Sequence, residues 1–471
     1  MNVTNRANFI QPSNDQGPER MLVIGLGLTG YSAVKYLVRS GMQVTAADSR
    51  ELPPYLKQVK DEFPQVEIIT GQIPYARFGS FKQIVASPGV EIERQNFSGG
   101  GALIGDIELF VRQAQAPIIA ITGSNGKSTV TMLVAEMLLA AGLKIKTGGN
   151  IGTPVLDLLD PAAPDYYVPD YYVLELSSFQ LETTHSLRAR AATVLNISAD
   201  HMDRYRDMDE YIAAKARILH AAAARVLNRD DAGSKKLLAA DPESISFGMD
   251  RPADNHYGVT GAGSSRALVR GDAVLARAEQ ITLQGEQNIA NILAAMALVE
   301  AAGVALNTAV VGAALNYGGL PHRCEMVAEV NGVKWINDSK GTNVGATIAA
   351  INGVGDDLIL IAGGIGKGAD FSPLAAARAR VRHAVLFGQD AEAIAAAMAD
   401  ADVHDDDGDD NEPNDYIHRA KDLTHAVSLA AGLARAGQTV LFSPACASFD
   451  MFDNYEHRGN VYKQLVWELV H

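Results

Sequence analysis

The sequence predicts an α/β protein of three domains, with Rossmann-like domains at the two ends and a central P-loop domain built on a parallel-rich sheet. Apolar strand patterns alternate with helical patterns, and this alternation restarts near Pro117 and again after Arg323. A chain of 471 residues is also too long for one core, which favours about three domains. The expected parts are a polar N-terminal arm over residues 1–19 and domains over residues 20–106, 107–319 and 320–471.

The composition excludes several protein classes. Hydrophobic residues make up 47% of the chain and charged residues 20%, as in a globular protein. A net charge of -15 argues against a surface for nucleic acid, which needs basic patches. The two cysteines, Cys324 and Cys446, form no metal pattern or disulfide framework, so we expect a reducing cytoplasm. We find neither an apolar run near the roughly 20 residues of a membrane span nor a signal peptide. The acidic run at residues 402–415 predicts a solvated loop, to which we give no function.

The N-terminal domain begins as a βαβ unit. Strands are predicted over Met21–Ile24 and Gln43–Ala47, with a helix over Thr29–Arg39 between them. The first turn reads GLGLTG and Asp48 ends the second strand, as in dinucleotide sites. The physical requirement is only a diphosphate at a helix N-terminus, so NAD or FAD, a UDP-sugar and a purely structural turn all stay open. A triphosphate loop further along the chain favours the UDP-sugar.

The central domain begins with that loop, between a strand predicted over Pro117–Ile121 and a helix over Ser128–Ala141 that Gly142 caps. Its glycines let backbone N–H groups approach a triphosphate, while Lys127 neutralises the outer phosphates and the Ser128 hydroxyl suits Mg²⁺. The usual early glycine is missing, so an ordinary glycine-rich turn is the alternative. The predicted ATP-binding residues of the loop are Gly123, Ser124, Asn125, Gly126, Lys127, Ser128 and Thr129.

Two further strands, over Tyr171–Leu174 and Thr193–Asn196, run into polar residues where open α/β sheets bind ligands. Glu175 at the end of the first is a natural Mg²⁺ ligand near a triphosphate. His201, after the second, is a candidate ligand for a second cation, although a lone histidine is more often structural. Lys215 in the next helical stretch reads, from composition alone, as a solvated cation.

The C-terminal domain carries two turns that each present a lysine after a strand. Lys340 lies in the turn Asp338–Asn343, and Lys367 lies in the glycine-rich turn Gly363–Gly368. Surface loops often have such compositions, but together the two turns favour a pocket for an acidic cosubstrate. The strands predicted for this domain cover Lys334–Ile336, Leu358–Ile361, Ala384–Phe387 and Thr439–Phe442.

In sequence order these residues resemble the Mur ligases, and among them the ligases that add D-glutamate to UDP-N-acetylmuramoyl-L-alanine. The resemblance covers the chain from about Met21 to the C-terminus. The blocks that carry it are IGLGLTG, ASPG, GDIELF, AITGSNGKSTVT, GGNIG, YVLELSSFQLETT, DHMDRY, GLPHRCE, WINDSKGTN and SPACASFD.

The resemblance implies a cytoplasmic ATP-dependent ligase of peptidoglycan precursor synthesis with a UDP-binding domain, a central ATPase domain and an amino-acid-binding domain. It implies an acyl-phosphate and a tetrahedral intermediate, two Mg²⁺ sites where Mn²⁺ can substitute, and a monomer. The implied catalytic residues are Lys127, His201, Lys215 and Lys340. The implied metal ligands are Ser128, Glu175, His201 and a CO₂-derived carbamate on Lys215.

The resemblance also implies which residues bind each substrate. Asn288, Arg323 and Asp338 join the phosphate loop in binding ATP. The residues implied around the UDP-substrate are Leu28, Thr29, Asp48, Ser49, Arg50, Ser87, Pro88, Gly89 and Asn150. The residues implied for D-glutamate are Lys340, Thr342, Lys367, Ser443 and Phe449.

The chain departs from the family pattern at two glycine-rich turns. Ile365 stands where the C-terminal loop often has an aspartate, and Gly341 makes SKGTN of the usual SKATN. Three other functions compete: a folylpolyglutamate synthetase-like ligase, a Mur ligase for another amino acid, and an NAD-dependent oxidoreductase. The GLGLTG turn argues against the first, and the loop around Lys127 argues against the last.

Overall fold

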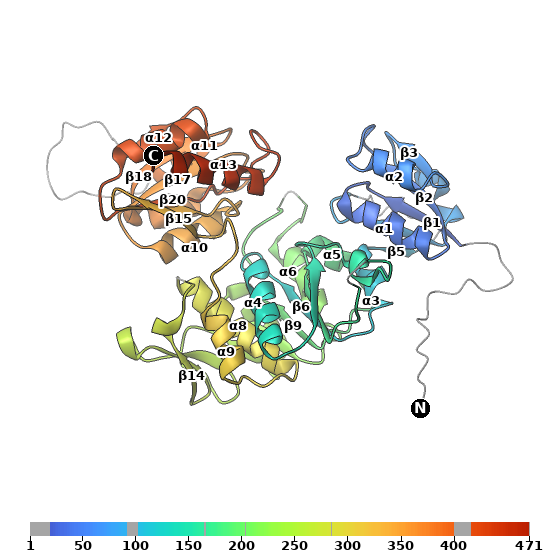
Figure 1. The fold of residues 1–471 in the computed structure, drawn as a ribbon, viewed down its shortest axis with the longest axis horizontal. Helices are drawn as coiled ribbons and strands as arrows, with labels where there is room; N and C mark the ends of the chain where they lie inside the picture. Colours follow the sequence, from blue (N-terminus) through green and yellow to red (C-terminus); the bar gives the residue numbers. More distant parts are fainter. Residues whose placement is uncertain are drawn as a thin grey trace.

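The computed structural model describes residues 19–91, 102–163, 166–202, 204–283, 285–399 and 416–470. Three β-sheets form within these residues, and the N-terminal and C-terminal domains both lie above the central one (Figure 1). The predicted α/β fold of three domains is confirmed. The acidic run at 402–415 and residues 1–18 of the polar arm lie outside the described residues.

The N-terminal sheet has five parallel strands in the order β3-β2-β1-β4-β5. Its strands are β1 (Arg20–Ile24), β2 (Gln43–Asp48), β3 (Glu67–Thr70), β4 (Gln83–Ala86) and β5 (Ala102–Ile104). Its helices are α1 (Leu28–Arg39) and α2 (Leu56–Glu62), with a 3₁₀ turn η1 (Tyr75–Ser80). The strand order reverses between β1 and β4, where such sheets bind ligands, and the GLGLTG turn lies at that point.

The central sheet has nine strands in the order β14-β13-β12-β11-β10-β9-β6-β8-β7, and only β12 to β14 pair antiparallel. The strands are β6 (Ile118–Thr122), β7 (Ile145–Gly149), β8 (Tyr171–Glu175), β9 (Ala191–Val194), β10 (Arg225–Asn228), β11 (Ile245–Phe247), β12 (Tyr257–Thr260), β13 (Ala267–Arg270) and β14 (Ala273–Arg277). The helices are α3 (Asp106–Val111), α4 (Lys127–Ala140), α5 (Ser178–Glu182), α6 (Met208–Ala216), α7 (Ala232–Ala240), α8 (Glu286–Ala301) and α9 (Thr308–Leu315). Short 3₁₀ turns are η3 (Val155–Leu159), η4 (Arg217–Leu219), η5 (Gly263–Ser265) and η6 (Ala278–Gln280).

Several predicted boundaries in this domain differ from the observed ones by one or two residues. The strand expected to reach Asn196 ends at Val194, because the Asn196 side chain leaves the sheet to bind the backbone of Asn125 in the phosphate loop. Helix α4 has Ala141 as its C-cap, and Gly142 follows in the left-handed conformation with φ +80.

The C-terminal sheet has six strands in the order β15-β16-β20-β17-β18-β19, of which β15 and β16 form an antiparallel hairpin. The strands are β15 (Glu325–Val330), β16 (Val333–Asn337), β17 (Leu358–Gly363), β18 (Val381–Phe387), β19 (Ile417–Arg419) and β20 (Thr439–Phe442). The helices are α10 (Val344–Val354), α11 (Ala391–Ala399), α12 (Leu423–Leu433) and α13 (Tyr455–Glu468), with the 3₁₀ segment η7 (Ser372–Arg380). All four strands expected here are present.

The hydrophobic cores divide the chain differently from the sheets. One cluster of buried side chains runs through both the N-terminal and central domains, including Leu37 of α1, Phe110 of α3 and Leu156 of η3. The C-terminal domain has two clusters of its own, one on each face of its sheet. The first two domains therefore share a core, whereas no buried cluster among the described residues joins the third domain to them.

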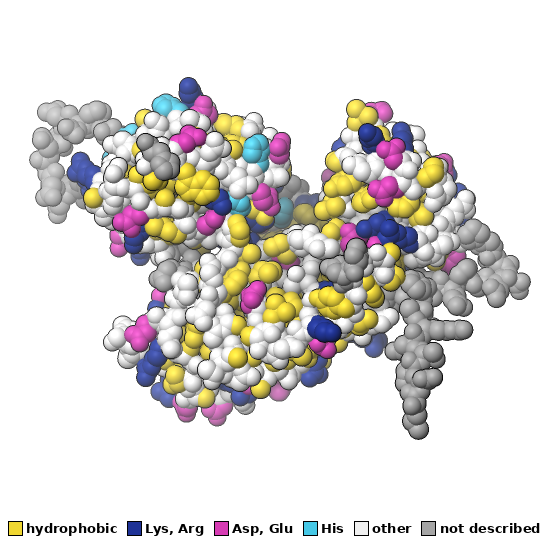
Figure 2. Space-filling model, in the orientation of Figure 1, with side chains coloured by type: hydrophobic (Ala, Val, Ile, Leu, Met, Phe, Trp, Pro, Cys, Tyr) yellow, Lys and Arg dark blue, Asp and Glu magenta, His cyan; other side chains and the backbone are white. Residues whose placement is uncertain are grey.

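The surface agrees with the composition. Figure 2 shows Lys and Arg side chains interspersed with Asp and Glu on the visible face, without a continuous basic field. None of the described helices combines the length and apolar character that a membrane crossing requires.

Glu108 of α3 is a buried carboxylate that ties the segment between the first two domains to the central domain. Its oxygens accept hydrogen bonds from the backbone N–H groups of His185 (2.7 Å) and Ser186 (2.9 Å) and from Arg112 Nε (2.9 Å). Burial raises the pKa of Glu108, but these hydrogen bonds outweigh it and lower the pKa below its ordinary value. The carboxylate is therefore held in its charged form.

Replacing Glu108 with alanine is expected to destabilise the protein by about 2–4 kcal/mol, because it leaves buried hydrogen-bond donors without an acceptor. The transition midpoint in chemical denaturation measures this loss. Arg112→Ala, which removes only a partly exposed partner, serves as the control and should cost less than about 1 kcal/mol. Equal losses in the two variants would contradict the assignment.

Candidate active site

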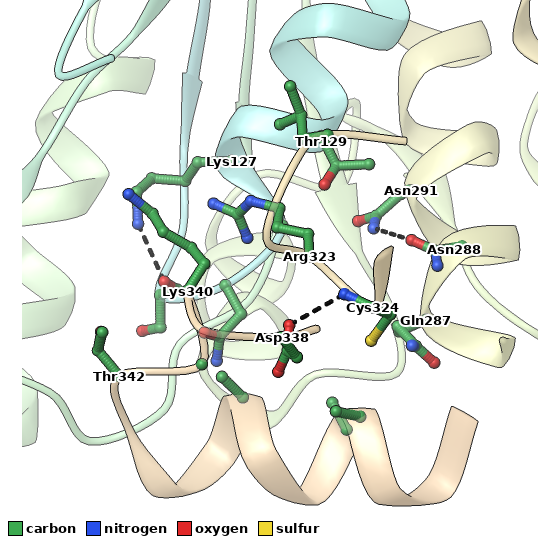
Figure 3. A pocket seen from close by; sticks show the side chains of 18 of the residues that line it. Lys127, Thr129, Gln287, Asn288, Asn291, Arg323, Cys324, Asp338, Lys340 and Thr342 are labelled. Carbon is green, nitrogen blue, oxygen red and sulfur yellow. Dashed lines mark hydrogen bonds between the residues drawn. The ribbon is translucent and has the colours of Figure 1, made fainter. Parts of the chain in front are cut away.

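A polar pocket lies between the central and C-terminal domains (Figure 3). It is lined on one side by the phosphate loop and helix α8, and on the other by residues between Arg323 and Thr342. The predicted residues that line it are Ser124, Asn125, Gly126, Lys127, Thr129, Asn150, Glu175, Asn288, Arg323, Asp338, Lys340 and Thr342. The structure thus gathers groups expected to contact ATP, metal, UDP-substrate and D-glutamate at one place.

The phosphate loop ends in a tight turn at the N-terminus of α4. Gly126 has φ +79, and a Cβ there would lie 2.6 Å from Asn291 Oδ1, so this position requires glycine. Lys127 Nζ donates to the carbonyl oxygens of Gly123 (2.8 Å) and Ser124 (2.9 Å). Burial lowers the pKa of Lys127. The loop therefore presents a cation and a helix N-terminus to an incoming anion.

Arg323 brings a second cation to this site from the segment that leads into the C-terminal domain. Its Nη2 donates to Ser128 Oγ over 2.8 Å. Ser128 itself is buried under the loop and is not among the residues that line the pocket. This contact joins the C-terminal domain to the start of α4. Figure 3 shows the Arg323 guanidinium near Lys127 and Thr129 at that end of the helix.

Glu175 provides an unused oxygen for a cation. The side chain is 2% exposed, and its Oε1 accepts a hydrogen bond from Asn150 Nδ2 over 2.8 Å. Its Oε2 is buried without a hydrogen-bond partner, which suits this oxygen to act as a ligand to a metal ion. Across the described ranges, His, Cys, Asp and Glu side chains form no group of three that could hold a metal ion alone. A metal here needs additional ligands from a nucleotide, a hydroxyl or a modified side chain.

Lys215 of α6 lies directly beneath the phosphate loop, so its interpretation as a solvated cation is wrong. The residue is 2% exposed, its Nζ donates to the carbonyl oxygen of Gly123 over 2.9 Å, and it lies 4.6 Å from the ring centre of Tyr211. Burial and then the nearby charge of Lys127 lower the pKa of Lys215 well below its ordinary value. The positive charge of Lys127 thus adds to burial in favouring the neutral form of the Lys215 amine.

His201 adopts the left-handed backbone conformation with φ +58. Its ring packs edge-on against Phe179, with 4.8 Å between the ring centroids, and its Nε2 lies 3.8 Å from Asp200. Asp200 lines the pocket, whereas His201 is not among the lining residues. The histidine therefore stands at the margin of the site.

Asp338 and Lys340 follow strand β16 into the pocket from the opposite side. Asp338 Oδ1 accepts from the backbone N–H of Cys324 (3.2 Å) and Oδ2 from Ser443 Oγ (2.6 Å). Burial raises the pKa of Asp338 to about 6. Lys340 Nζ lies 3.5 Å from the ring centre of Tyr455, and burial lowers the pKa of Lys340 to about 8.

The glycine at 341 has a steric reason. A Cβ there would lie 2.5 Å from Asp338 Oδ2 and 2.6 Å from Ser443 Oγ. Alanine would therefore push apart the hydrogen bond that holds Asp338. The hydrogen bond between Ser443 and Asp338 therefore depends on glycine at position 341.

The other residues expected for D-glutamate lie outside the pocket. Ser443 is fully buried, and its hydroxyl contacts Asp338 and Thr347. Lys367 has φ +53 and its Nζ lies 5.7 Å from the ring centre of Phe449, which is 65% exposed. The backbone of the nearby Ile365 pairs with Ala447 in an antiparallel bridge. Of this set, the structure brings only Lys340 and Thr342 into the pocket.

Apart from Asn150, which lines the polar pocket, the residues expected around the UDP-substrate lie at the carboxyl ends of strands in the N-terminal sheet. Asp48 accepts hydrogen bonds from the backbone of Leu26 (2.7 Å) and from Arg50, and Ser87 Oγ donates to the carbonyl oxygen of Gly25 over 3.0 Å. A Cβ on Gly30 would lie 1.6 Å from that same carbonyl oxygen, so helix α1 can pack this closely only with glycine. Leu28 and Thr29 begin α1, Ser49 follows β2, and Pro88 and Gly89 follow β4.

Among the pocket residues that sequence reasoning missed are Gln287, Asn291 and Cys324 (Figure 3). Asn291 Nδ2 donates to Asn288 Oδ1 over 3.1 Å, so the two amides on α8 act as a pair. Their spacing of three residues on a helix was an available signal.

Models of three domains match most of the chain. They are the Mur ligase MurD-like N-terminal domain over residues 19–100, the Mur ligase middle domain over residues 121–299 and the Mur ligase glutamate ligase domain over residues 322–446. The chain belongs to the Mur ligase family. The pocket thus lies where the matched middle and glutamate ligase domains of this Mur ligase meet.

Similar full-length relatives carry one name, UDP-N-acetylmuramoylalanine–D-glutamate ligase. The relative from Nitrosococcus oceani is 44% identical over 467 residues, covering 98% of this Mur ligase and 99% of that protein. The relative from Marinobacter nauticus is 47% identical over 455 residues, covering 95% and 98%.

Solved structures share the fold at low identity. UDP-N-acetylmuramate-alanine ligase from Thermotoga maritima matches with a TM-score of 0.59 at 14% identity, covering 95% of this chain and 99% of that one. Folylpolyglutamate synthase from Mycobacterium tuberculosis matches with a TM-score of 0.55 at 18% identity, covering 75% and 92%. These likenesses concern the three-dimensional arrangement alone.

Proposed function

We propose that this Mur ligase uses ATP to join D-glutamate to UDP-N-acetylmuramoyl-L-alanine, as a monomer in cytoplasmic synthesis of peptidoglycan precursors. The observation that carries the proposal is one pocket that combines Lys127, Arg323, Lys340 and the unpartnered oxygen of Glu175. The name shared by relatives at 44% and 47% identity supports the choice of substrates.

The proposed substrates divide among the domains. ATP occupies the pocket, with its phosphates on residues 123–129 and Arg323, and its nucleoside near Asn288 and Asp338. The UDP group sits at the GLGLTG turn, and D-glutamate approaches from the C-terminal domain. We retain bounds of 20–106, 107–319 and 320–471 for these domains. Lys340 and Thr342 are the favoured D-glutamate contacts; Lys367 and Phe449 require movement towards the pocket, and Ser443 supports Asp338.

Glu175 and Ser128 would hold one Mg²⁺ together with the phosphates, and His201 with a carbamate on Lys215 would hold the second; Mn²⁺ would suit the same ligands. Bound metal offsets the repulsion between a carboxylate and ATP. The carbamate forms when the neutral amine attacks the carbon of CO₂ and releases a proton, and the lowered pKa of Lys215 favours that neutral amine. Carbamylation turns a buried cation into a carboxylate-like ligand.

In the proposed reaction the carboxylate of UDP-N-acetylmuramoyl-L-alanine attacks the γ-phosphate of ATP, giving an acyl phosphate and ADP. Lys127 and Arg323 stabilise the charge on the transferring phosphate. The neutral amine of D-glutamate then attacks the acyl carbon, and the tetrahedral intermediate collapses to an amide and phosphate. Lys340 neutralises the acyl phosphate from the side of the C-terminal domain.

A folylpolyglutamate synthase-like activity is the second candidate, because that enzyme shares the fold. The match of the N-terminal domain to a MurD-like model argues against it. The discriminating experiment supplies ATP, Mg²⁺ and UDP-N-acetylmuramoyl-L-alanine with a panel of amino acids and measures phosphate release. Release with D-glutamate alone is expected; equal release with L-glutamate, or none with D-glutamate, would refute the proposal.

The pH dependence of kcat/KM for ATP is expected to show two limbs. Below about pH 6 Asp338 gains a proton and loses its charge, and above about pH 8 Lys340 loses its proton and its charge. The value should therefore be highest between these pH values, at saturating concentrations of the other substrates. In Lys340→Arg the alkaline limb should disappear, because a guanidinium stays protonated; a limb that persists near pH 8 belongs to another group.

A further inference from the structure

Helix α1 of the N-terminal domain meets η3 of the central domain through charged side chains. Lys35 Nζ lies 2.6 Å from Asp157 Oδ1, and Ser32 Oγ donates to the same oxygen over 3.0 Å. Arg39 forms an ion pair with Asp160. The three α1 residues lie three and four positions apart, so they share one face of the helix. We call this set of contacts the α1–η3 seam.

The centre of the seam is partly withdrawn from water. The side chains of Lys35 and Asp157 are 18% and 21% exposed, and Ser32 is buried. Interactions between charges strengthen as solvent is excluded, so this pair constrains geometry more than an exposed pair does. An exposed pair for comparison is Arg251 with Asp272, whose side chains are 73% and 81% exposed.

Apolar packing alone leaves the seam incompletely filled. Leu37 and Leu156 belong to the core shared by the two domains, but a cavity remains beside the ion pairs. Tyr36 and Leu159 line that cavity together with Lys35 and Arg39. Since a gap lets two surfaces shift, the polar contacts to Asp157 set the relation between α1 and η3.

Both elements of the seam lead directly to proposed substrate positions. Helix α1 begins at Leu28 in the GLGLTG turn and also carries Lys35, so the two residues are joined by one rigid helix. On the other side, η3 follows strand β7 and Asn150, which donates to Glu175. A change at the seam therefore moves the turn for the UDP group relative to Glu175 and the phosphate loop.

We propose that Asp157 is a positioning residue, which holds the UDP-binding turn at the correct separation from the ATP pocket through Lys35 and Ser32. This inference rests on the proposed function for its assay. It assigns Asp157 no contact with substrate. It predicts a selective effect on the use of the UDP-substrate.

The test is charge reversal at the seam. Asp157→Lys is expected to raise KM for UDP-N-acetylmuramoyl-L-alanine about 10-fold, with KM for ATP and kcat changed less than about 3-fold. The milder Asp157→Asn keeps the size of the side chain and should raise the same KM about 3-fold. The exchanged pair Lys35→Asp with Asp157→Lys should return KM to within about 3-fold of the original value. Asp272→Lys, in the exposed pair, is the matched control and should change nothing.

Hydrogen exchange supplies a readout that needs no substrate. Asp157→Lys should speed amide exchange in α1 and η3, and the exchanged pair should restore it. Unchanged KM and exchange in both Asp157 variants, equal rises in both KM values, or no recovery in the exchanged pair would overturn the proposal. If the unmodified protein does not turn over the UDP-substrate, the proposed function fails, and the exchange measurement still decides whether the seam holds the domains.

Discussion

Replacing Lys215 with alanine is expected to lower kcat by a factor of about 100 to 1,000, the loss typical of removing a positioned charge from a reacting centre. The buried amine lies under the phosphate loop, and α6 contains no other lysine that could replace it. Added formate or acetate should restore part of the activity, because a small carboxylate fits the space left by the carbamate.

Steady-state phosphate release with and without the carboxylate measures this effect. Lys235→Ala, at an exposed position of α7, is the control and should keep full activity. Normal turnover of Lys215→Ala would refute the carbamate. Loss without rescue, in a variant that unfolds at the same temperature as the original protein, would instead assign Lys215 to support of the loop through Gly123.

Replacing Lys127 with methionine is expected to lower kcat/KM for ATP by a factor of about 100 to 1,000. Methionine keeps an unbranched side chain only one atom shorter than lysine but removes the charge at the start of α4, where the phosphates are proposed to bind. Because burial already disfavours the charged amine, the variant should unfold at an equal or higher temperature.

Coupled measurement of ADP formation at several ATP concentrations checks the prediction. The control is Lys144→Met, an exposed lysine just beyond the other end of α4. Activity of Lys127→Met within about 3-fold of the original enzyme would show that Arg323 and the helix N-terminus suffice for phosphate binding.

The parts of the fold and site that sequence predicts well are local. A strand, a glycine turn and a helix that follow one another produced both the GLGLTG turn and the phosphate loop, within one or two residues of the observed boundaries. Glu175 could be predicted as a site residue for the same reason, since it directly ends strand β8. Neighbours in sequence determine these features.

The features that sequence did not predict depend on residues far apart in the chain. Arg323 reaches Ser128 across 195 positions, and Lys215 reaches Gly123 across 92. The burial of Lys215, the support of Asp338 by Ser443 and the α1–η3 seam all follow from tertiary packing, which residue types alone do not encode. The hairpin strand β15 was missed because its partly exposed residues lack a continuous apolar run.

The most direct test of the proposed ligase mechanism follows oxygen atoms. UDP-N-acetylmuramoyl-L-alanine labelled with ¹⁸O in its terminal carboxylate is incubated with the protein, ATP, Mg²⁺ and D-glutamate, and the products are analysed by mass spectrometry. An acyl phosphate predicts one ¹⁸O in each released phosphate and an amide to D-glutamate in the nucleotide product. Phosphate without label, or label transfer without a D-glutamate amide, would contradict the account.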